Sequence, residues 1–410
     1  MNYSNSLIRR YLSLSKNHNS SDKLPSLTSS ALVDVELYSI IAIICRDHIN
    51  IWYEQMTHDK SFVEELLFLI SHIIKELEKR FFMVKHEMLF LDSIPMIAIK
   101  HINGKAQKIV KEDINSHKTF DEILHKFQPH PALDSQENEH LYLRLVADGL
   151  ITSLLPSNDL KSECERVIIR EILSDFVLKK AIDKLSEPSI LFEVITKLII
   201  HLKEKSIDNT TKGVFFASFI IIKMYNFVIF LWKNLFITNS SRFVILNVFD
   251  LACFEFIFEI FELRTENPYI YVFIRFFLIP CFFVFIGDII SIQFMRFWNQ
   301  HIFTEKFAVS CFRALRVVIW PSNSLEISKI QQCKSDNYKI KERLESEIYS
   351  SIPVFLRKQF FGSNDEVKDR IKRICSLFDS KLSNKHFIFY ILDLILRNIL
   401  YELSDTTEFV

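Results

Sequence analysis

Glycine is scarce in this chain, with only five among 410 residues. A Rossmann fingerprint, a Walker phosphate loop and a nucleophile elbow each need glycines close together. The five glycines are far apart: Gly104, Gly149, Gly213, Gly287 and Gly362. We therefore expect none of the nucleotide or hydrolase chemistry that depends on such loops.

Net charge is also absent, because 50 Lys and Arg residues balance 50 Asp and Glu residues. Proteins that bind nucleic acids usually carry a basic excess or a basic stripe. We expect no nucleic-acid partner. No Ser-His-Asp, paired-carboxylate or Cys-His arrangement stands out either, so the sequence does not predict an enzyme.

Closely spaced cysteines are missing as well. The seven cysteines include no C-x-x-C pair, which argues against zinc ribbons and a disulfide framework and favours a reducing, cytosolic setting. His101 and His386 each follow a lysine and have no metal-ligating side chain three or four residues later. We expect neither a metal site nor a cofactor.

Phenylalanine, by contrast, is abundant, and twenty of the 39 lie between residues 201 and 300. Burying one Phe side chain is worth roughly 1.5–3 kcal/mol, so this block faces a protein core, a bilayer or a bound lipid. The alternative is a Phe-rich protein core that binds no lipid. The lipid-cavity candidates within the block are Phe216, Phe219, Phe227, Phe230, Phe276 and Phe283.

Two segments of this block, 214–237 and 269–295, approach the length of about 20 apolar residues that a membrane-spanning helix needs. Lys223 interrupts the first, and Arg275 and Asp288 interrupt the second. A charge in mid-membrane costs at least about 2.5–3.5 kcal/mol. We expect buried helices in a membrane-associated body, and an integral membrane protein remains the alternative.

Helical spacing of apolar residues dominates the chain, and the predicted fold class is all-α. Residues 1–30 are rich in Ser and Asn without the apolar run of a secretory signal, which is typical of a disordered tail. Polar linker or surface segments are expected over 206–212 and 329–341. Helices are expected over 31–56, 61–80, 85–103, 136–155, 160–185, 188–203, 365–381 and 384–403.

Several short motifs in the first half follow one another in a set order. An R-D-x-x-x-x-W-Y pattern on the first helix supplies Arg46, Asp47, Trp52 and Tyr53, and His101 lies near the end of the third helix. E-H-L-Y-L-R begins at position 139, and R-E-I-L supplies Arg170 and Glu171. As an ordered set, these motifs resemble the PXA (PX-associated) domain over residues 31–204.

The last predicted helix carries N-K-H-F-I-F-Y-I-L-D, which supplies Asn384, Lys385, His386 and Asp393. With Ile319-Trp320-Pro321 and Phe360-Phe361-Gly362, this signature resembles the sorting-nexin C-terminal domain over residues 267–410. Residues 205–266 would be a Phe-rich helical connector. The chain thus resembles a small fungal member of the sorting-nexin tethers that lacks their PX and RGS domains, and nothing before Ala31 reads as their membrane hairpin.

This resemblance implies one helical body in which the two modules enclose an apolar cavity suited to acyl chains. It further implies a non-enzymatic lipid-binding, lipid-transfer or tethering protein, peripheral on endoplasmic reticulum or on endosome and vacuole membranes. Its partners would be phospholipids or fatty acyl chains and the membrane surface; protein partners are not indicated. The alternative is a trafficking adaptor without a lipid guest.

For the motif residues a structural role is favoured over a direct one. Trp52 and Tyr53 could line a lipid portal, but core packing on the first helix is the better interpretation. The charged residues Arg46, Asp47, Arg170 and Glu171 could surround an opening, but ion pairs that hold helices together are expected more often.

Overall fold

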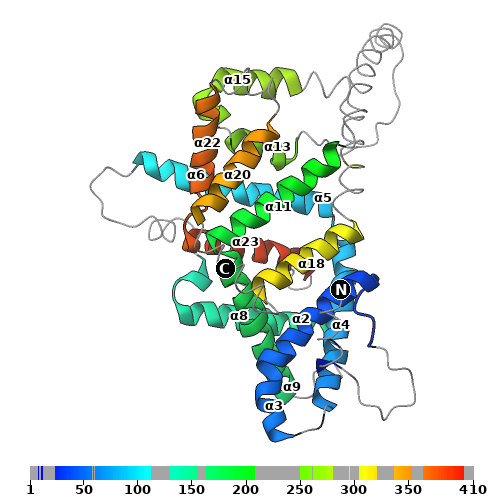
Figure 1. Ribbon diagram of the computed structural model, residues 1–410. Helices are drawn as coiled ribbons and strands as arrows, with labels where there is room; N and C mark the ends of the chain where they lie inside the picture. The colour runs from blue at the N-terminus through cyan, green and yellow to red at the C-terminus, as the bar shows by residue number, and fades with distance from the viewer. Residues whose placement is uncertain are drawn as a thin grey trace, which may run out of the picture.

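The computed structural model describes residues 8, 11–12, 24–57, 59, 61–111, 130–155, 163–207, 250–260, 262–279, 295, 304–320, 337–352 and 363–400. Every regular element in these ranges is helical (Figure 1), which confirms the all-α prediction. None of these helices has both the length and the apolar character to cross a membrane. The candidate span 214–237 lies outside the described residues, as does 269–295 beyond position 279 apart from Met295.

The first half of the chain folds into long helices that contain π-helical turns. The bounds are α2 Ala31–Ile44, η1 Cys45–Ile49, α3 Asn50–Met56, α4 Ser61–Met83, α5 His86–Met88, η2 Leu89–Ser93, α6 Ile94–Lys111, η3 Pro131–Leu133, α8 Gln136–Leu154, α9 Glu163–Glu171, η5 Ile172–Lys179, α10 Lys180–Leu185 and α11 Pro188–Ile207. The helix expected over 31–56 is therefore continuous but changes its hydrogen-bond pattern at Cys45. The π-helical turn contains the motif residues Arg46 and Asp47.

The second half adds shorter helices. Their bounds are α13 Ala252–Ile260, α14 Leu263–Glu266, α15 Pro268–Val272, η7 Phe273–Leu278, α18 Glu305–Ile319, α20 Asn337–Ser351, α22 Asn364–Ser376 and α23 Lys381–Ile399.

Serine side chains fix where several helices begin. The Ser30 hydroxyl accepts a hydrogen bond from the Val33 N–H at 3.3 Å, and Ser135 does the same for Asn138 at 3.0 Å. Such caps satisfy backbone donors that have no partner within the helix, and each is worth about 1 kcal/mol. Local sequence thus sets the starts of α2 and α8.

The predictions of both polar segments are wrong in part. Helix α11 continues to Ile207, so the linker expected from Ser206 begins in helix. Helix α20 begins at Asn337, inside the expected surface segment 329–341. It is highly charged, yet Ile340, Leu344 and Ile348 recur every four residues and pack against the second core described below. Its polar composition masks a narrow apolar stripe.

The first core unites helices from both halves of the chain. Apolar side chains of α2, η1 and α4 pack with Ile319 and Trp320 at the end of α18. A buried charge reinforces this contact: Glu36 on α2, 4% exposed, accepts from Arg313 at 2.8 Å and from Arg316 at 3.4 Å. The second half of the chain therefore completes the core of the first.

A second core forms around α11. Phe192 on α11 packs with residues of α13, α20 and α22, among them Phe258, Leu344 and Ile371. Segments that carry the two sequence signatures are therefore packed together in one elongated helical body. Figure 1 shows α15 and α3 at opposite ends of this body and α23 crossing its middle.

Candidate functional site

Helix α23 is the element where the second sequence signature meets the first. It contacts α4, α6 and α10, and its N-terminus is capped by Ser380, whose hydroxyl accepts from the Ser383 N–H at 3.3 Å. One side of α23 is buried in the middle of the body, including Asn384, His386 and Phe389. The motif residues of α23 are therefore interface residues.

Asn384 joins α23 to the turn that follows α10. Its side chain is fully buried, and its amide nitrogen donates to the Ser186 carbonyl at 3.1 Å and to the Phe378 carbonyl at 2.8 Å. Both carbonyls lie at ends of helices, where the backbone oxygens lack partners within the helix. One amide group thus satisfies two helix ends that are distant in sequence.

Lys385 places a nearly buried positive charge between two carboxylates. Its ammonium lies 2.6 Å from Glu139 Oε1 on α8 and 2.8 Å from Asp183 Oδ1 on α10. Burial alone would lower the pKa of the Lys385 ammonium, but the hydrogen bonds to Asp183 and Glu139 outweigh it, and the pKa is raised. The charge is therefore retained and holds three helices together.

Asp393 forms a second polar contact farther along α23. The Tyr142 hydroxyl of α8 donates to Asp393 Oδ1, and His130 Nε2 lies 3.1 Å from Asp393 Oδ2. His130 Nδ1 accepts from the Ala132 N–H, so the ring proton belongs on Nε2, where it is donated to Asp393. Burial, followed by the charge of Asp393 and its hydrogen bond, raises the pKa of Tyr142.

The two motif histidines, His101 and His386, meet between α6 and α23. His101 Nε2 lies 3.1 Å from the Ser383 hydroxyl, and the centroids of the His101 and His386 rings are 5.7 Å apart. Both rings are buried. The structure therefore brings one histidine of each signature into ring contact, and His101 also contacts Ser383 of α23.

Arg80 of α4 lies at the C-terminal end of α23. Its guanidinium donates to the Ser153 carbonyl of α8 at 2.8 Å and to the Ile399 carbonyl of α23 at 3.4 Å. Glu76, one turn earlier on α4, lies 3.6 Å away. Arg80 thus caps the C-terminal ends of two helices, where a positive charge complements the helix dipole.

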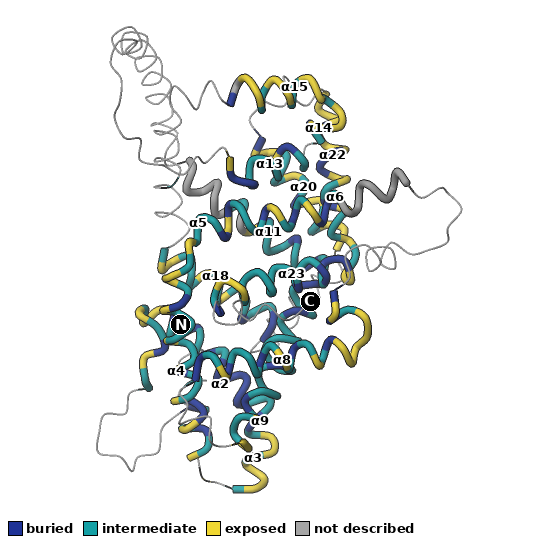
Figure 2. Tube along the Cα trace, turned by 180° about the vertical axis from the view of Figure 1, so that it is seen from behind, coloured by how far each residue is buried: buried dark blue, intermediate teal, exposed yellow. Residues whose placement is uncertain are grey.

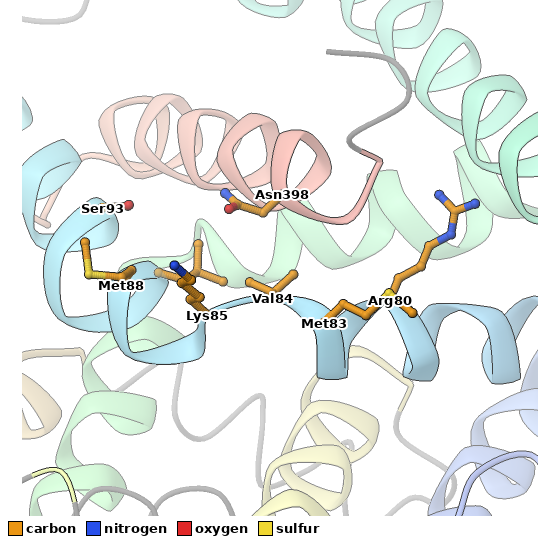
Figure 3. Close-up of a pocket in the computed structure, with 8 residues that line it drawn as sticks. Arg80, Met83, Val84, Lys85, Met88, Ser93 and Asn398 are labelled. Carbon is orange, nitrogen blue, oxygen red and sulfur yellow. The ribbon is translucent and has the colours of Figure 1, made fainter. Parts of the chain in front are cut away.

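A cavity of about 320 Å³ opens beside Arg80, between the α4–α5 connection and the end of α23 (Figure 3). The side chains around it are Arg80, Met83, Val84, Lys85, Met88, Leu89, Ser93 and Asn398. Figure 3 shows Met83, Val84, Lys85 and Met88 along the α4–α5 side, facing Asn398 of α23. Four of the eight are apolar, and the exposed Lys85 adds a positive charge. This volume is at the lower end of the range for small-molecule sites.

The motif residues of the first half lie away from this cavity. Arg46 Nη2 donates to Asp47 Oδ2 at 2.9 Å in the π-helical turn. Arg170 Nη2 donates to Glu171 Oε1 at 3.0 Å, and Arg144 of α8 donates to the same oxygen. The Arg144–Glu171 contact therefore joins α8 to the end of α9.

Trp52 and Tyr53 divide between surface and core. Tyr53 packs against the first core, whereas Trp52 is exposed at α3. Their rings and that of Phe62 lie within 5.1–6.0 Å of one another. Figure 1 places α3 at the far end of the body from α15.

Of the six lipid-cavity candidates, only Phe276 lies within the described residues. It is 66% exposed on η7 and does not contribute to the wall of the cavity near α23. Phe216, Phe219, Phe227, Phe230 and Phe283 lie outside the described residues, and their role stays a prediction.

Within the described ranges, one group of side chains has the spacing of metal ligands. Ligand atoms of His140, Glu171 and Asp175 lie within 4.8 Å of one another. However, the carboxylate of Glu171 already accepts from Arg144 and Arg170, and two guanidinium groups would repel a cation. We assign this group to the contact between α8 and α9–η5.

Sequence reasoning missed the partners of α23. Glu139, His130 and Tyr142 complete its polar contacts, but they precede α23 by more than 230 residues in sequence. Only the order of the motifs along the chain carried a signal. Arg80 has no motif at all and is recognised only from the two helix ends that it caps.

Comparison with known proteins accounts for the first signature. Residues 30–198 match the family model of the PXA domain. PXA domain protein 1 of Schizosaccharomyces pombe is 32% identical over 170 residues, which cover 41% of this chain and 33% of that protein. Sorting nexin-13 of Mus musculus is 26% identical over 187 residues, which cover 42% of this chain and 20% of that protein.

Sorting nexin-19 of Mus musculus is 21% identical over 186 residues, which cover 43% of this chain and 18% of that protein. These matches span a third or less of each relative's own length. No solved structure gives a significant match. The family match confirms the PXA resemblance drawn from the ordered motifs: residues 30–198 of this chain are similar to the PXA domain.

Proposed function

We propose that this chain is a non-enzymatic lipid-binding protein that transfers lipid or tethers membranes at cytosolic membrane surfaces in endomembrane trafficking. Relatives of the PXA segment include proteins named sorting nexins, and this supports the trafficking part. The lipid part rests on the cavity beside α23. The protein would be peripheral on endoplasmic reticulum membranes or on endosome and vacuole membranes.

The chemistry of the cavity suits an amphiphile. Met83, Val84, Met88 and Leu89 offer an apolar wall, and methionine side chains adapt to chains of varied shape. Lys85 lies at the rim, where its ammonium can meet a phosphate or carboxylate group. The guest expected is therefore a fatty acid or a single acyl chain of a phospholipid, which would lie against the methionines.

The test is lipid extraction from the purified full-length chain followed by mass spectrometry. We expect near-stoichiometric phospholipid or fatty acid in the wild type. Val84→Trp should fill the cavity and lower the bound lipid at least fivefold. Val167→Trp, at an exposed site on α9, should leave it unchanged. A folded wild-type protein that carries no lipid would refute the proposal.

The charge at the rim allows a second, matched comparison. Lys85→Glu should reduce lipid transfer between donor and acceptor vesicles, because it places a negative charge beside the lipid head group. Lys372→Glu changes a charge of the same sign at an exposed position on α22, outside the wall of the cavity. If both variants transfer lipid equally well, Lys85 does not contact the head group. If the cavity variants also bind the same protein partners as the wild type, that result would favour a trafficking adaptor that binds no lipid.

A further inference from the structure

One face of α15–η7 is apolar, aromatic and exposed. Tyr269 is 89% exposed, Phe276 66%, Phe277 61%, Phe273 56% and Val272 45%. These five positions follow the i, i+3, i+4, i+7, i+8 spacing of a single helical face. We refer to them as the α15 face. Figure 2 shows α15 at one end of the body, drawn largely in the colour of exposed residues.

The opposite side of the same helix is attached to the body. Tyr271 donates its hydroxyl to Glu255 on α13 at 2.9 Å, and its ring meets Phe258 edge-on at 5.7 Å. Ile274 and Ile279 pack into the second core. The orientation of α15–η7 is thus fixed by its inner side, so its outer side faces away from the second core.

Ion pairs hold the preceding turn in place. Glu262 has a left-handed backbone conformation, with φ of 50°, which is costly for a residue other than glycine. Arg373 of α22 donates to Glu262 at 2.6 Å and to Glu266 at 3.1 Å, and Arg370 also pairs with Glu266. The α15 face is therefore presented on a rigid support.

Area and charge together favour one occupant. Aromatic side chains offer about 150–250 Å² each, so the exposed part of the α15 face amounts to about 500 Å². A stable protein–protein interface needs about 800 Å² per partner. Residues 268–279 contain a single charged side chain, Arg275, and no acid. An uncharged aromatic face at the end of a body suits the boundary region of a bilayer, where such helices lie about 5–10 Å deep.

We propose that the α15 face inserts into the surface of a phospholipid membrane and is a membrane-contact surface of this chain. The inference deepens the proposed function, because it names where the protein meets the bilayer. Since the face carries little charge, insertion should need no anionic lipid. Tyr269, at the start of the helix, has a polar hydroxyl that can remain at the head-group level.

The experiment is flotation of the full-length chain with vesicles of phosphatidylcholine alone. The wild type should float, and the triple variant Phe273→Asp, Phe276→Asp, Phe277→Asp should bind at least about tenfold more weakly. A control with Leu141→Asp and Leu145→Asp changes two exposed apolar residues on α8 and should float like the wild type. Circular dichroism should show the same helix content in all three proteins.

Two further measurements separate a bilayer from a protein partner. A triple Leu variant at the same three positions keeps the apolar face but removes the stacked pair of Phe273 and Phe277, whose ring centroids are 6.2 Å apart. A bilayer should accept leucine, so its binding should stay within about threefold of the wild type. Binding should also persist at about 1 M salt, where the Debye length is about 3 Å.

Three results would overturn the inference. The Asp triple variant could float as well as the wild type, or flotation could vanish at high salt. Alternatively, the wild type could be a dimer that the Asp triple variant dissociates, without vesicle binding, which would assign the α15 face to a second copy. If lipid is extracted from the purified protein in any of these cases, the proposed function stands and only this surface is excluded.

Discussion

Helix α23 and the α15–η7 helix use aromatic and polar residues in opposite ways. At α23, charged and amide side chains are buried, and each meets partners on other helices, as Lys385 does with Glu139 and Asp183. At α15–η7, large apolar side chains such as Phe276 are exposed on a helix that is otherwise firmly attached. Burial of polar groups is costly unless they are paired, and exposure of a large apolar patch is unusual in a monomer. The first arrangement joins parts of one chain, and the second is suited to an external partner.

The largest expected effect comes from the same substitution made in both places. Phe389 on α23 is fully buried among Leu143, Ile182 and Ala132, so Phe389→Ala should lower the free energy of unfolding by about 3–5 kcal/mol. Phe276→Ala should change it by less than about 0.5 kcal/mol. Urea unfolding followed by circular dichroism measures both. Equal losses would mean that the α15 face is packed in solution and would remove the contrast.

A second pair of variants tests whether buried charge holds α23. Lys385→Ala leaves Glu139 buried without its cation and should cost about 2–3 kcal/mol, somewhat below the value for a fully buried pair because Asp183 is partly exposed. Lys381→Ala, one turn earlier, removes an exposed pair with Glu187 and should cost less than about 1 kcal/mol. The same unfolding measurement compares them, and similar costs would reduce Lys385 to a surface contact.

The smallest effect concerns Tyr142 and the alkaline range. Tyr142→Phe removes the hydrogen bond to Asp393 and should cost about 1–2 kcal/mol at neutral pH. In the folded protein the pKa of Tyr142 is raised above its usual 10.0. Above pH 10 the unfolded chain therefore loses this proton while the folded chain keeps it, and stability falls as the pH rises.

The Tyr142→Phe variant lacks that titration, so its stability should decline less steeply above pH 10 than that of the wild type. Tyr338→Phe is the matched control, because Tyr338 is 78% exposed on α20. Unfolding curves recorded at several alkaline pH values give both slopes. Identical slopes for wild type and Tyr142→Phe would contradict a pKa of Tyr142 raised by burial and by Asp393.

Sequence alone predicted the helices whose signals are local. The apolar spacing over residues 136–155 placed α8 within a residue of its observed bounds, and the structure adds the Ser135 cap at its start. Helices α18 and α20 were not predicted. Helix α20 was missed because it carries charges throughout and its apolar stripe is only one residue wide per turn. The π-helical turns were also missed, because such turns are rare and no motif in the sequence marked them.

The packing of α23 against the first half of the chain could be predicted only as an association of two modules, through family resemblance. Which atoms meet depends on packing between residues far apart, such as Asn384 with Ser186 and Asp393 with His130. No periodicity of either segment encodes such a pair. The prediction that the aromatic block walls a lipid cavity remains open, since Phe276 alone of its candidates lies among the described residues, on an exposed face.

The buried Glu36 has a consequence for the order of events during protein synthesis. Its partner Arg316 is 280 residues later in the chain, and translation proceeds at about 5–20 residues per second. The first helix therefore leaves the ribosome about 15–55 seconds before the cation that neutralises its carboxylate has been made. Until then Glu36 must stay hydrated, so the final docking of α2 is postponed until most of the chain has been translated.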